Sequence, residues 1–238
     1  SGINIFPPFR IYDEMDIKNY EAGWKANWMD NQIRTQANFY YMDIDNQQVN
    51  FESTDVVIGQ DNRSAPGNTE IYGIEFSAQA HVNDLHVDLG MGYMHSDIGK
   101  FENVVDPFRT LDNGGVDVVI DLSGERTPYT PEFTGNVGVS YDFHLGGMLE
   151  GYMLTPRVDV SHTSDLKTKL WDSPLVKLDD RTLANGRLTL AAPGDKWSAI
   201  FWANNMFDKG YVSGIQNLAS LYYAGRPLEF GFNLKYNF

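Results

Sequence analysis

The chain has 238 residues, of which 32 are acidic and 18 are basic, and its formal net charge is −14 at pH 7. This acidic balance argues against a nucleic-acid partner, which needs basic surface, and the lack of cysteine excludes thiol catalysis, disulfides and cysteine metal sites. Hydrophobic residues make up 42% of the chain, and no stretch approaches the roughly 20 apolar residues of a membrane-spanning helix.

Alternation of apolar and polar residues is the main pattern along the chain, and it predicts β-strands whose two faces differ. In the first strand, Tyr20, Trp24 and Trp28 share one face, while Glu21 and Lys25 share the other. Strands of a membrane β-barrel have this pattern, because one face meets lipid and the other meets water. In chain order, the predicted strands are Tyr20–Met29, Ile33–Ile44, Thr69–Val82, Leu85–Ser96, Glu132–Leu145, Gly151–Thr163, Thr182–Ala191, Lys196–Phe207 and Arg226–Phe238.

The last of these strands, Arg226–Phe238, is long enough to cross a bilayer. At about 3.3 Å per residue it gives roughly 43 Å of path, or about 30 Å of height at a tilt of about 45°. Its even-numbered side chains from Leu228 to Phe238 are apolar, whereas the odd-numbered ones include Glu229 and Lys235. A soluble edge strand rarely needs so long a two-faced run, because strands usually have about five or six residues.

The connections between the predicted strands alternate between short and long. The short ones span 30–32, 83–84, 146–150 and 192–195, and the long ones span 45–68, 97–131, 164–180 and 208–225. Such sorting is typical of an outer-membrane barrel, whereas a soluble sandwich has no reason to sort its loops. We therefore expect the short turns and Phe238 in the periplasm and the long loops outside the cell. In the longest loop, Val116–Ile120 is a candidate hairpin arm.

The cost of placing charge in lipid decides which face meets the membrane. A charged side chain on the lipid face costs about 2–4 kcal/mol near the bilayer midplane. Polar faces that carry Arg157, Asp159, Glu229 and Lys235 are therefore expected to line the lumen, and the apolar faces to meet lipid. Aromatic residues near strand ends fit interfacial girdles: Tyr20, Trp24, Trp28, Tyr72, Tyr93, Tyr141, Tyr152 and Tyr236.

Short motifs in three parts of the chain point to one family. Residues 19–25 (NYEAGWK) contain a YE-x-G-x-K-like strand, which continues into 39–48 (FYYMDIDNQQ). Residues 205–211 (NMFDKGY) are close to NLFD-x-x-Y, and 225–227 (GRP) open a strand that ends in Phe238, close to G-x-PR…F with Arg and Pro reversed. In their order and spacing, these segments resemble the C-terminal half of TonB-dependent outer-membrane receptors.

The resemblance implies an all-β fold, a transmembrane antiparallel up-and-down β-barrel of about 22 strands, preceded by a plug domain with a TonB box. Nine is an odd number, whereas bacterial single-chain barrels have even strand counts. The opening residues, Ser1-Gly2-Ile3, have no signal-peptide features. We therefore expect residues 1–238 to be the C-terminal portion of the receptor barrel, about nine strands, with the plug domain and N-terminal strands absent.

The resemblance also implies energised import across the bacterial outer membrane. A scarce extracellular ligand would bind in the loop vestibule, and TonB would pull the plug. The expected ligand is a ferric siderophore, with oligosaccharide, cobalamin or haem as alternatives. Expected partners are outer-membrane lipid and lipopolysaccharide, TonB through the plug, and the barrel assembly machinery, whose signal is Tyr236 and Phe238. The family implies no enzymatic activity, cofactor or metal.

Aromatic and basic residues in the long loops are the candidates for ligand contact. An anionic ferric chelate would bind Arg and Lys, whereas a sugar would stack on Trp or Tyr. Loop–loop packing and solvation are the alternative roles for the same residues. The candidates are Phe101, Phe108, Arg109, Arg126, Lys167, Lys169, Trp171, Tyr222 and Tyr223.

The histidines and the acidic residues give weaker signals. The histidines lie on different strands without metal-site spacing. Alternation places His86 and His144 on the lumen face, and His95 and His162 on the lipid face. An acidic run in the longest loop could bind calcium but lacks the EF-hand pattern, so a solvated loop is the alternative. Its members are Asp112, Asp117, Asp121 and Glu125.

Two other classes of barrel protein remain as alternatives. An outer-membrane barrel enzyme, such as a lipid hydrolase, would need a Ser nucleophile beside a His on the lipid side. Ser161 and His162 are adjacent in sequence and therefore point to opposite faces. A passive porin would have a wide lumen and no plug.

Overall fold

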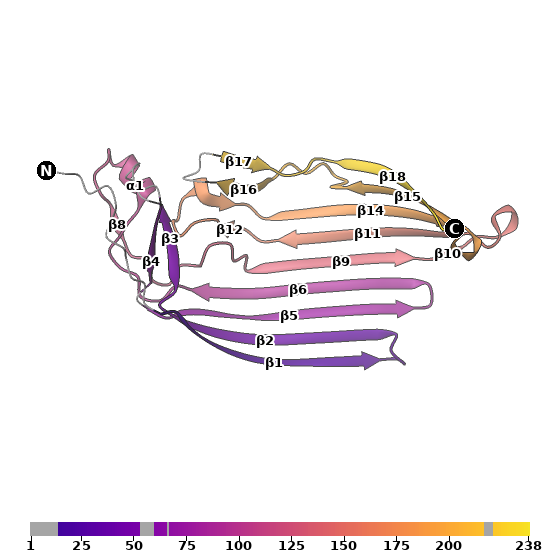
Figure 1. The fold of residues 1–238 in the computed structure, drawn as a ribbon, viewed down its shortest axis with the longest axis horizontal. Helices are drawn as coiled ribbons and strands as arrows, with labels where there is room; N and C mark the ends of the chain where they lie inside the picture. The colour runs from indigo at the N-terminus through magenta and orange to yellow at the C-terminus, as the bar shows by residue number, and fades with distance from the viewer. Residues whose placement is uncertain (1–13, 53–59, 66, 217–220) are drawn as a thin grey trace. The chain divides into compact units, whose positions relative to one another are not determined.

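One antiparallel sheet contains all the long strands in the computed structural model of the chain (Figure 1). The structure describes residues 14–52, 60–65, 67–216 and 221–238. Each long strand pairs with the next long strand of the chain, which confirms the up-and-down order predicted from the sequence. In sheet order the strands are β1 (Asp16–Trp28), β2 (Ile33–Asp45), β5 (Thr69–Val82), β6 (Leu85–Asp97), β9 (Phe133–Tyr141), β11 (Met153–Thr163), β14 (Arg181–Ala191), β15 (Trp197–Asn204) and β18 (Glu229–Tyr236).

Shorter elements occupy the connections. Four of the connections contain two-stranded ladders, and β10 (Phe143–His144) pairs with β11 of the main sheet. The ladders are β3–β4 (Gln48–Glu52, Gln60–Ser64), β7–β8 (Val104–Val105, Val119–Ile120), β12–β13 (Leu166–Lys167, Lys177–Leu178) and β16–β17 (Val212–Gln216, Leu221–Ala224). The described helices are α1 (Pro107–Asp112), η1 (Gly147–Leu149), η2 (Pro174–Val176) and η3 (Pro193–Asp195). Among the described residues, no helix has the length and apolar character that crossing a membrane requires.

Apolar side chains of neighbouring strands stand opposite one another across the sheet. Val139 of β9 is paired with Val158 of β11. Leu188 of β14 is paired with Phe201 of β15, and Phe201 is paired with Phe232 of β18. Because successive side chains alternate between faces, this register gathers the apolar residues on one face and the polar residues on the other. The apolar face and the polar face predicted for single strands therefore continue from strand to strand across the sheet.

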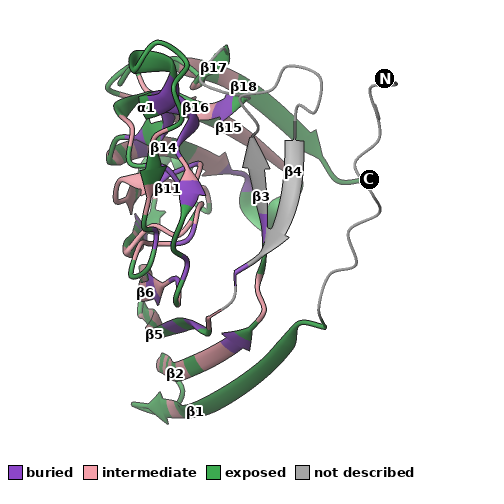
Figure 2. Cartoon of the chain, turned by 90° about the vertical axis from the view of Figure 1, so that its left-hand side faces the viewer, coloured by how far each residue is buried: buried purple, intermediate pink, exposed green. Residues whose placement is uncertain are grey.

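The apolar face of the sheet is not packed into a protein interior. On β18, Phe230, Phe232 and Leu234 are 68%, 64% and 69% exposed. The outermost strand at the other edge, β1, is likewise drawn as exposed along most of its length (Figure 2). A contiguous apolar surface of this kind marks a region of contact with lipid or with another protein.

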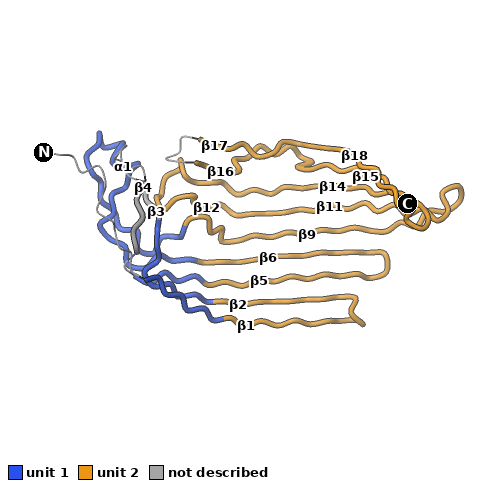
Figure 3. The backbone as a smooth tube through the Cα atoms, viewed as in Figure 1, with its two compact units in different colours: residues 1–20, 41–71, 96–127 blue, residues 21–40, 72–95, 128–238 orange. Residues whose placement is uncertain are grey.

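Two compact units can be distinguished along the chain (Figure 3). Each has its own buried residues. The first unit comprises residues 1–20, 41–71 and 96–127. Its core lies in the loop that follows β6, where Ile98, Phe101 and Leu122 are buried. The loop is held by backbone bonds such as the one from the Leu122 amide to the Phe101 carbonyl, at 3.0 Å. The longest loop therefore has a fold of its own.

The helix α1 begins in that loop at a well-formed N-cap. Asp106 is buried, and its carboxylate accepts hydrogen bonds from the amides of Phe108 and Arg109 at 2.9 and 3.1 Å. Pro107 occupies the first helical turn, where its missing N–H leaves no donor unpaired. The sequence did not lead us to expect this helix, because it is short and its core partners are distant in the chain.

The second unit comprises residues 21–40, 72–95 and 128–238. It contains most of the length of the long strands, and it has a small core in the loop between β11 and β14. Leu170, Trp171, Val176 and Leu178 are buried there. The amide of Thr168 donates to the Val176 carbonyl at 2.8 Å and closes this loop on itself.

Several predicted boundaries were wrong. The connection 45–68, expected to be a loop, contains the hairpin β3–β4. Only part of the expected hairpin arm at Val116–Ile120 is strand, and it pairs with Val104–Val105. A ladder as short as β7–β8 depends on contacts within the loop, and such contacts produce no alternation of apolar and polar residues in the sequence.

The terminal strand is also shorter than predicted, because β18 runs only over Glu229–Tyr236. Pro227 lacks the N–H that a ladder needs, and the Leu228 amide donates to the Asp208 carboxylate at 2.9 Å instead of to a strand. At the other end, the Asn237 amide still donates to the Lys196 carbonyl at 3.0 Å. On the neighbouring strand, β15 ends at Asn204 and not at Phe207.

Candidate functional site

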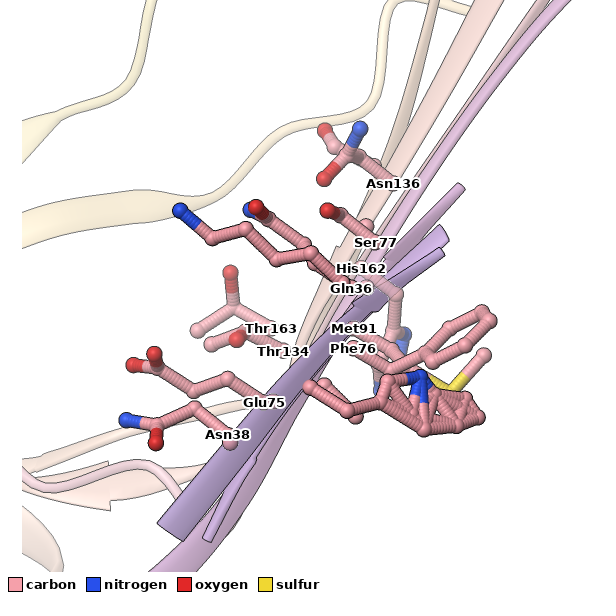
Figure 4. A pocket seen from close by; sticks show the side chains of 18 of the residues that line it. Gln36, Asn38, Glu75, Phe76, Ser77, Met91, Thr134, Asn136, His162 and Thr163 are labelled. Carbon is pink, nitrogen blue, oxygen red and sulfur yellow. The ribbon is translucent and has the colours of Figure 1, made fainter. Parts of the chain in front are cut away.

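A hollow of about 920 Å³ lies along the middle of the sheet within the second unit. Figure 4 shows Asn38, Glu75, Thr134 and Thr163 projecting to one side of the strands, while Phe76 projects to the other. Most of the polar lining consists of uncharged amides and hydroxyls, accompanied by a few charged side chains. The polar lining is Glu21, Lys25, Gln36, Asn38, Glu75, Ser77, Thr134, Asn136, Ser161 and Thr163, and His162, on the opposite face, also borders the hollow.

Glycines allow some of these side chains to lie flat against the neighbouring strand. A Cβ atom built on Gly90 would be 2.6 Å from Oδ1 of Asn136, and one built on Gly231 would be 2.4 Å from Cζ2 of Trp202. Real Cβ atoms do not approach so closely, so the amide and the indole occupy space that any other residue would fill. At these two points of the polar face, the amide and the indole lie directly over the neighbouring strand.

Arg157 forms the strongest ionic cluster on the polar face. Its Nη2 and Nε donate to Oδ1 of Asp159 at 2.6 and 2.9 Å, and its Nη1 donates to Oδ2 of Asp88 at 2.9 Å. The Arg157 side chain is 20% exposed. Charge-assisted bonds in such partly buried positions are stronger than neutral ones. The cluster joins β6 and β11 across β9.

A second polar cluster lies nearer to the short turns. His86 Nε2 and Oδ2 of Asp142 are 2.9 Å apart, and Thr155 donates to Oδ1 of Asp142 at 2.5 Å. The rings of His81 and His86 have centroids 4.0 Å apart. These side chains, with Arg157, line a hollow of about 570 Å³. Within the described part of the chain, no three His, Asp or Glu side chains are arranged to hold a metal ion.

On the opposite face, two histidines contact aromatic and hydroxyl groups near the long loops. The ring of His162 lies 5.9 Å from that of Phe133, and Nδ1 of His162 is 2.8 Å from the Thr182 hydroxyl. The ring of His95 lies 5.1 Å from that of Tyr72. The partner of His162 is thus Thr182, and Ser161 points to the other face.

The first unit contains four of the nine ligand-contact candidates. Phe101 and Phe108 are 5% and 9% exposed and belong to the loop core. Arg109 is exposed, and its Nε lies 3.4 Å from Oδ2 of Asp106. Arg126 is half-buried. Only the two arginines of this group therefore reach the surface of the unit.

The second unit contains the other five candidates, and two of these are buried as well. Trp171 is 2% exposed and Lys167 is 8% exposed, whereas Lys169 is half-buried. Tyr222 and Tyr223 are 48% and 50% exposed on β17. Tyr222 and Tyr223 are thus exposed, whereas Trp171 is buried.

Two hydrogen bonds bring the loops of the second unit together. The Tyr222 hydroxyl donates to the Leu175 carbonyl at 3.1 Å. The Tyr129 amide donates to the Lys167 carbonyl at 2.8 Å. Next to Tyr222, the Tyr223 hydroxyl donates to the Gln216 side chain on β16. Sequence reasoning did not single out Gln216, because no pattern marks a lone glutamine in a loop.

One member of the acidic run of the longest loop, Asp121, closes a turn within that loop. Asp121 accepts hydrogen bonds from the Ser123 hydroxyl at 2.6 Å and from the Ser123 amide at 2.9 Å. These bonds lower the pKa of the Asp121 carboxyl below its ordinary value. The arrangement is a turn closed by an aspartate.

The aromatic rings of Tyr236 and Phe238 contact each other. Tyr236 and Phe238 have ring centroids 5.1 Å apart and an interplanar angle of 69°, an edge-to-face arrangement. Both side chains are exposed. The assembly signal expected from these two residues remains a prediction.

The long two-faced strands, the up-and-down order and the exposed apolar face define a part of an antiparallel β-barrel. The family model described as TonB dependent receptor-like, beta-barrel, matches residues 12–206. The chain therefore belongs to the TonB-dependent receptor family, whose barrels lie in the outer membrane, and the resemblance found in the sequence is confirmed.

Solved structures of this family share the fold. The ferric yersiniabactin uptake receptor FyuA from Yersinia pestis aligns with a TM-score of 0.68 at 15% identity, over 94% of this chain and 30% of that chain. The ferripyoverdine receptor of the outer membrane of Pseudomonas aeruginosa aligns with a TM-score of 0.67 at 17% identity, over 96% and 28%. The ferric citrate transporter FecA aligns with a TM-score of 0.60 at 15% identity, over 92% and 30%. The chain thus spans less than a third of the length of these receptors.

Proposed function

We propose that this chain is the C-terminal portion of the barrel of a receptor that imports a scarce ligand across the bacterial outer membrane. The observation that carries the proposal is the family match over residues 12–206. Receptors with the same fold are named for ferric siderophores and ferric citrate. The proposed ligand is accordingly a ferric siderophore, and the proposed source of energy is TonB acting on a plug domain outside residues 1–238.

The edges of the sheet support the assignment to a larger barrel. In the sheet order, β1 and β18 each have a neighbour on one side only. A strand edge exposed to lipid leaves backbone groups without partners, at several kcal/mol for each group. Further strands of the same receptor would pair with both edges and close the barrel. The apolar face would then meet lipid and lipopolysaccharide, and the polar face would surround the plug.

The long loops are the proposed binding region. Arg109, Arg126, Lys169, Tyr222 and Tyr223 reach or approach the surface and are the proposed contact residues. The other predicted candidates are buried, and we assign them to holding the loops in shape. These are Phe101, Phe108, Lys167 and Trp171.

Uptake by whole cells tests the function. Cells that carry the complete receptor are supplied with radioactive iron bound to defined siderophores, and the same cells lacking the receptor or TonB are the controls. We expect accumulation that needs both genes. Accumulation that persists without TonB would indicate a passive porin. Labelled oligosaccharide, cobalamin and haem in parallel test the alternative cargoes, and TonB-dependent uptake of one of these would replace the siderophore.

The assembly partner is tested separately. We propose that the barrel assembly machinery reads Tyr236 and Phe238, since both rings are exposed. Replacing Phe238→Ala in the complete receptor should reduce the amount of folded protein in the outer membrane. Phe207→Ala, another exposed phenylalanine, is the matched control. Equal amounts for the two variants would contradict the assignment.

A further inference from the structure

The hairpin β16–β17 is built from uncharged residues. Between Gly210 and Gly225 the sequence contains no Asp, Glu, Lys or Arg, although the whole chain has a net charge of −14. An outer loop exposed to water ordinarily carries charge, since charged side chains are the cheapest to solvate. The uncharged sequence of this hairpin therefore differs from what solvation alone would favour.

One face of this hairpin is anchored to the protein. Ile215 and Tyr222 are directly paired across the ladder and share that face. Ile215 is 5% exposed, and the Tyr222 hydroxyl donates to the Leu175 carbonyl. The hairpin is therefore fixed to the loop between β11 and β14.

The other face of the hairpin is displayed. Gln216 is paired with Leu221, and Gly214 is paired with Tyr223, so these four residues share the second face. Leu221 and Tyr223 are 55% and 50% exposed. A Cβ on Gly214 would lie 3.6 Å from Cδ2 of Tyr223, so the ring lies along the glycine. The Tyr223 hydroxyl donates to Gln216, which holds the ring in this orientation.

Three cationic residues of the second unit, Lys177, Lys167 and Arg181, are paired, buried and stacked on a tyrosine, respectively. Lys177 Nζ lies 3.2 Å from Oδ2 of Asp165, and Lys167 is buried. The Arg181 guanidinium lies over the ring of Tyr211, 5.5 Å from its centroid. The loop at 164–180 holds three lysines against four aspartates. An anionic ligand approaching the hairpin would meet no excess of positive charge from this loop, and at low ionic strength the aspartates would repel it.

We infer that the hairpin β16–β17 selects an uncharged ligand that presents a flat apolar face beside hydrogen-bonding groups. Tyr223 stacks on that face, and Gln216 orients the tyrosine ring. Aromatic rings bind such faces through area burial and their polar edge. A sugar ring of an oligosaccharide and a neutral iron chelate both have this chemistry. The inference rests on the proposed function, in which the long loops bind the imported ligand.

Equilibrium binding to the complete receptor in outer-membrane vesicles tests the inference. The probes are a neutral ferric trihydroxamate, a trianionic ferric tris-catecholate and an uncharged glucose oligosaccharide. We expect one of the two uncharged probes to bind at least about tenfold more tightly than the anionic probe. Binding of the oligosaccharide would identify a sugar as the ligand, and binding of the trihydroxamate would identify a neutral iron chelate. Adding salt should leave its affinity nearly unchanged, because no ion pair is formed.

Variants of the stacking residue sharpen the test. Tyr223→Ala should weaken binding of the uncharged probe by about tenfold or more, while Tyr223→Phe, which keeps the ring, should stay within about threefold. Tyr129→Ala is the matched control, because Tyr129 is an exposed tyrosine of another loop of the same unit. Heat-modifiable mobility on gels confirms that each variant is folded.

The outcomes also separate this inference from the proposed function. Three outcomes would each overturn the inference. The first is that the anionic probe binds most tightly, and the second is that neither uncharged probe binds. The third is that Tyr223→Ala and Tyr129→Ala bind the uncharged probe with equal affinity. TonB-dependent uptake of the anionic chelate would then still support the proposed function. If no cargo is taken up with TonB, the proposed function itself fails, whatever the effect of Tyr223.

Discussion

The side-chain amide of Asn205 donates to the Arg226 carbonyl at 3.1 Å and so ties the end of β15 to the entry of the last strand. The same amide nitrogen donates to the Lys209 carbonyl at 3.0 Å, and Oδ1 accepts from the Lys209 amide at 2.9 Å. Asn205 is 4% exposed. One buried side chain therefore closes the turn that leads out of β15 and also fixes where the terminal strand begins.

Replacing Asn205→Ala should destabilise the barrel by about 1–3 kcal/mol, because buried backbone groups lose their partners. The free energy of unfolding in urea, measured for the complete receptor in lipid, checks this value. Asn204→Ala is the matched control, since Asn204 is its exposed neighbour on β15. Equal stability of the two variants would show that the hydrogen bonds of Asn205 contribute little.

The two faces of β18 should respond differently to the same substitution. Phe232→Lys places a charge on the apolar face and should cost about 2–4 kcal/mol if that position lies near the midplane of the bilayer. Asn233→Lys, one residue away on the polar face, should cost much less. Unfolding in lipid vesicles measures both. A similar cost at the two positions would contradict the assignment of the apolar face to lipid.

Removing Arg157 should leave two carboxylates without their shared cation. Asp88 and Asp159 are 40% and 41% exposed, so water compensates in part. We expect Arg157→Met to cost about 1–3 kcal/mol, toward the lower end of that range. Arg187→Met is the control, because Arg187 is exposed and is paired with Arg157 in the sheet register. Adding Asp88→Asn and Asp159→Asn to Arg157→Met should recover part of the loss, and a further loss would rule out charge repulsion as the cause.

The contact between Gly231 and Trp202 predicts a double-mutant result. A methyl group at Gly231 would overlap the indole ring, and overpacking of this kind typically costs about 1–3 kcal/mol. Gly231→Ala should therefore destabilise the barrel and change the fluorescence of Trp202. Gly210→Ala should do neither, because its Cβ would meet nothing within 4 Å. If the indole is the obstacle, adding Trp202→Ala should cancel most of the cost of Gly231→Ala.

The long strands could be predicted from the sequence because their environment is repetitive. A strand between lipid and water must alternate along its whole length, as Phe230, Phe232 and Leu234 do opposite Glu229 and Lys235. That requirement is local, and a reader of the sequence can detect it strand by strand. The turn positions follow from the same pattern, and the order of strands follows from the alternation of short and long connections.

The loops could not be predicted in the same way, because their structure depends on contacts between distant residues. Val104–Val105 pairs with Val119–Ile120 across α1, and no local pattern marks either segment. An aromatic residue in a loop also looks the same whether it is buried, as Trp171 is, or exposed, as Tyr223 is. The sequence therefore indicated which loop residues are aromatic or basic but could not separate those on the surface from those in the core.

The Tyr129–Lys167 and Tyr222–Leu175 bonds join three stretches of chain that leave the sheet at different strands. A force applied to the hairpin β16–β17 is consequently transmitted to the two neighbouring loops as well. We therefore expect these loops to move together rather than independently, so that cleavage of the backbone in one of them loosens the others.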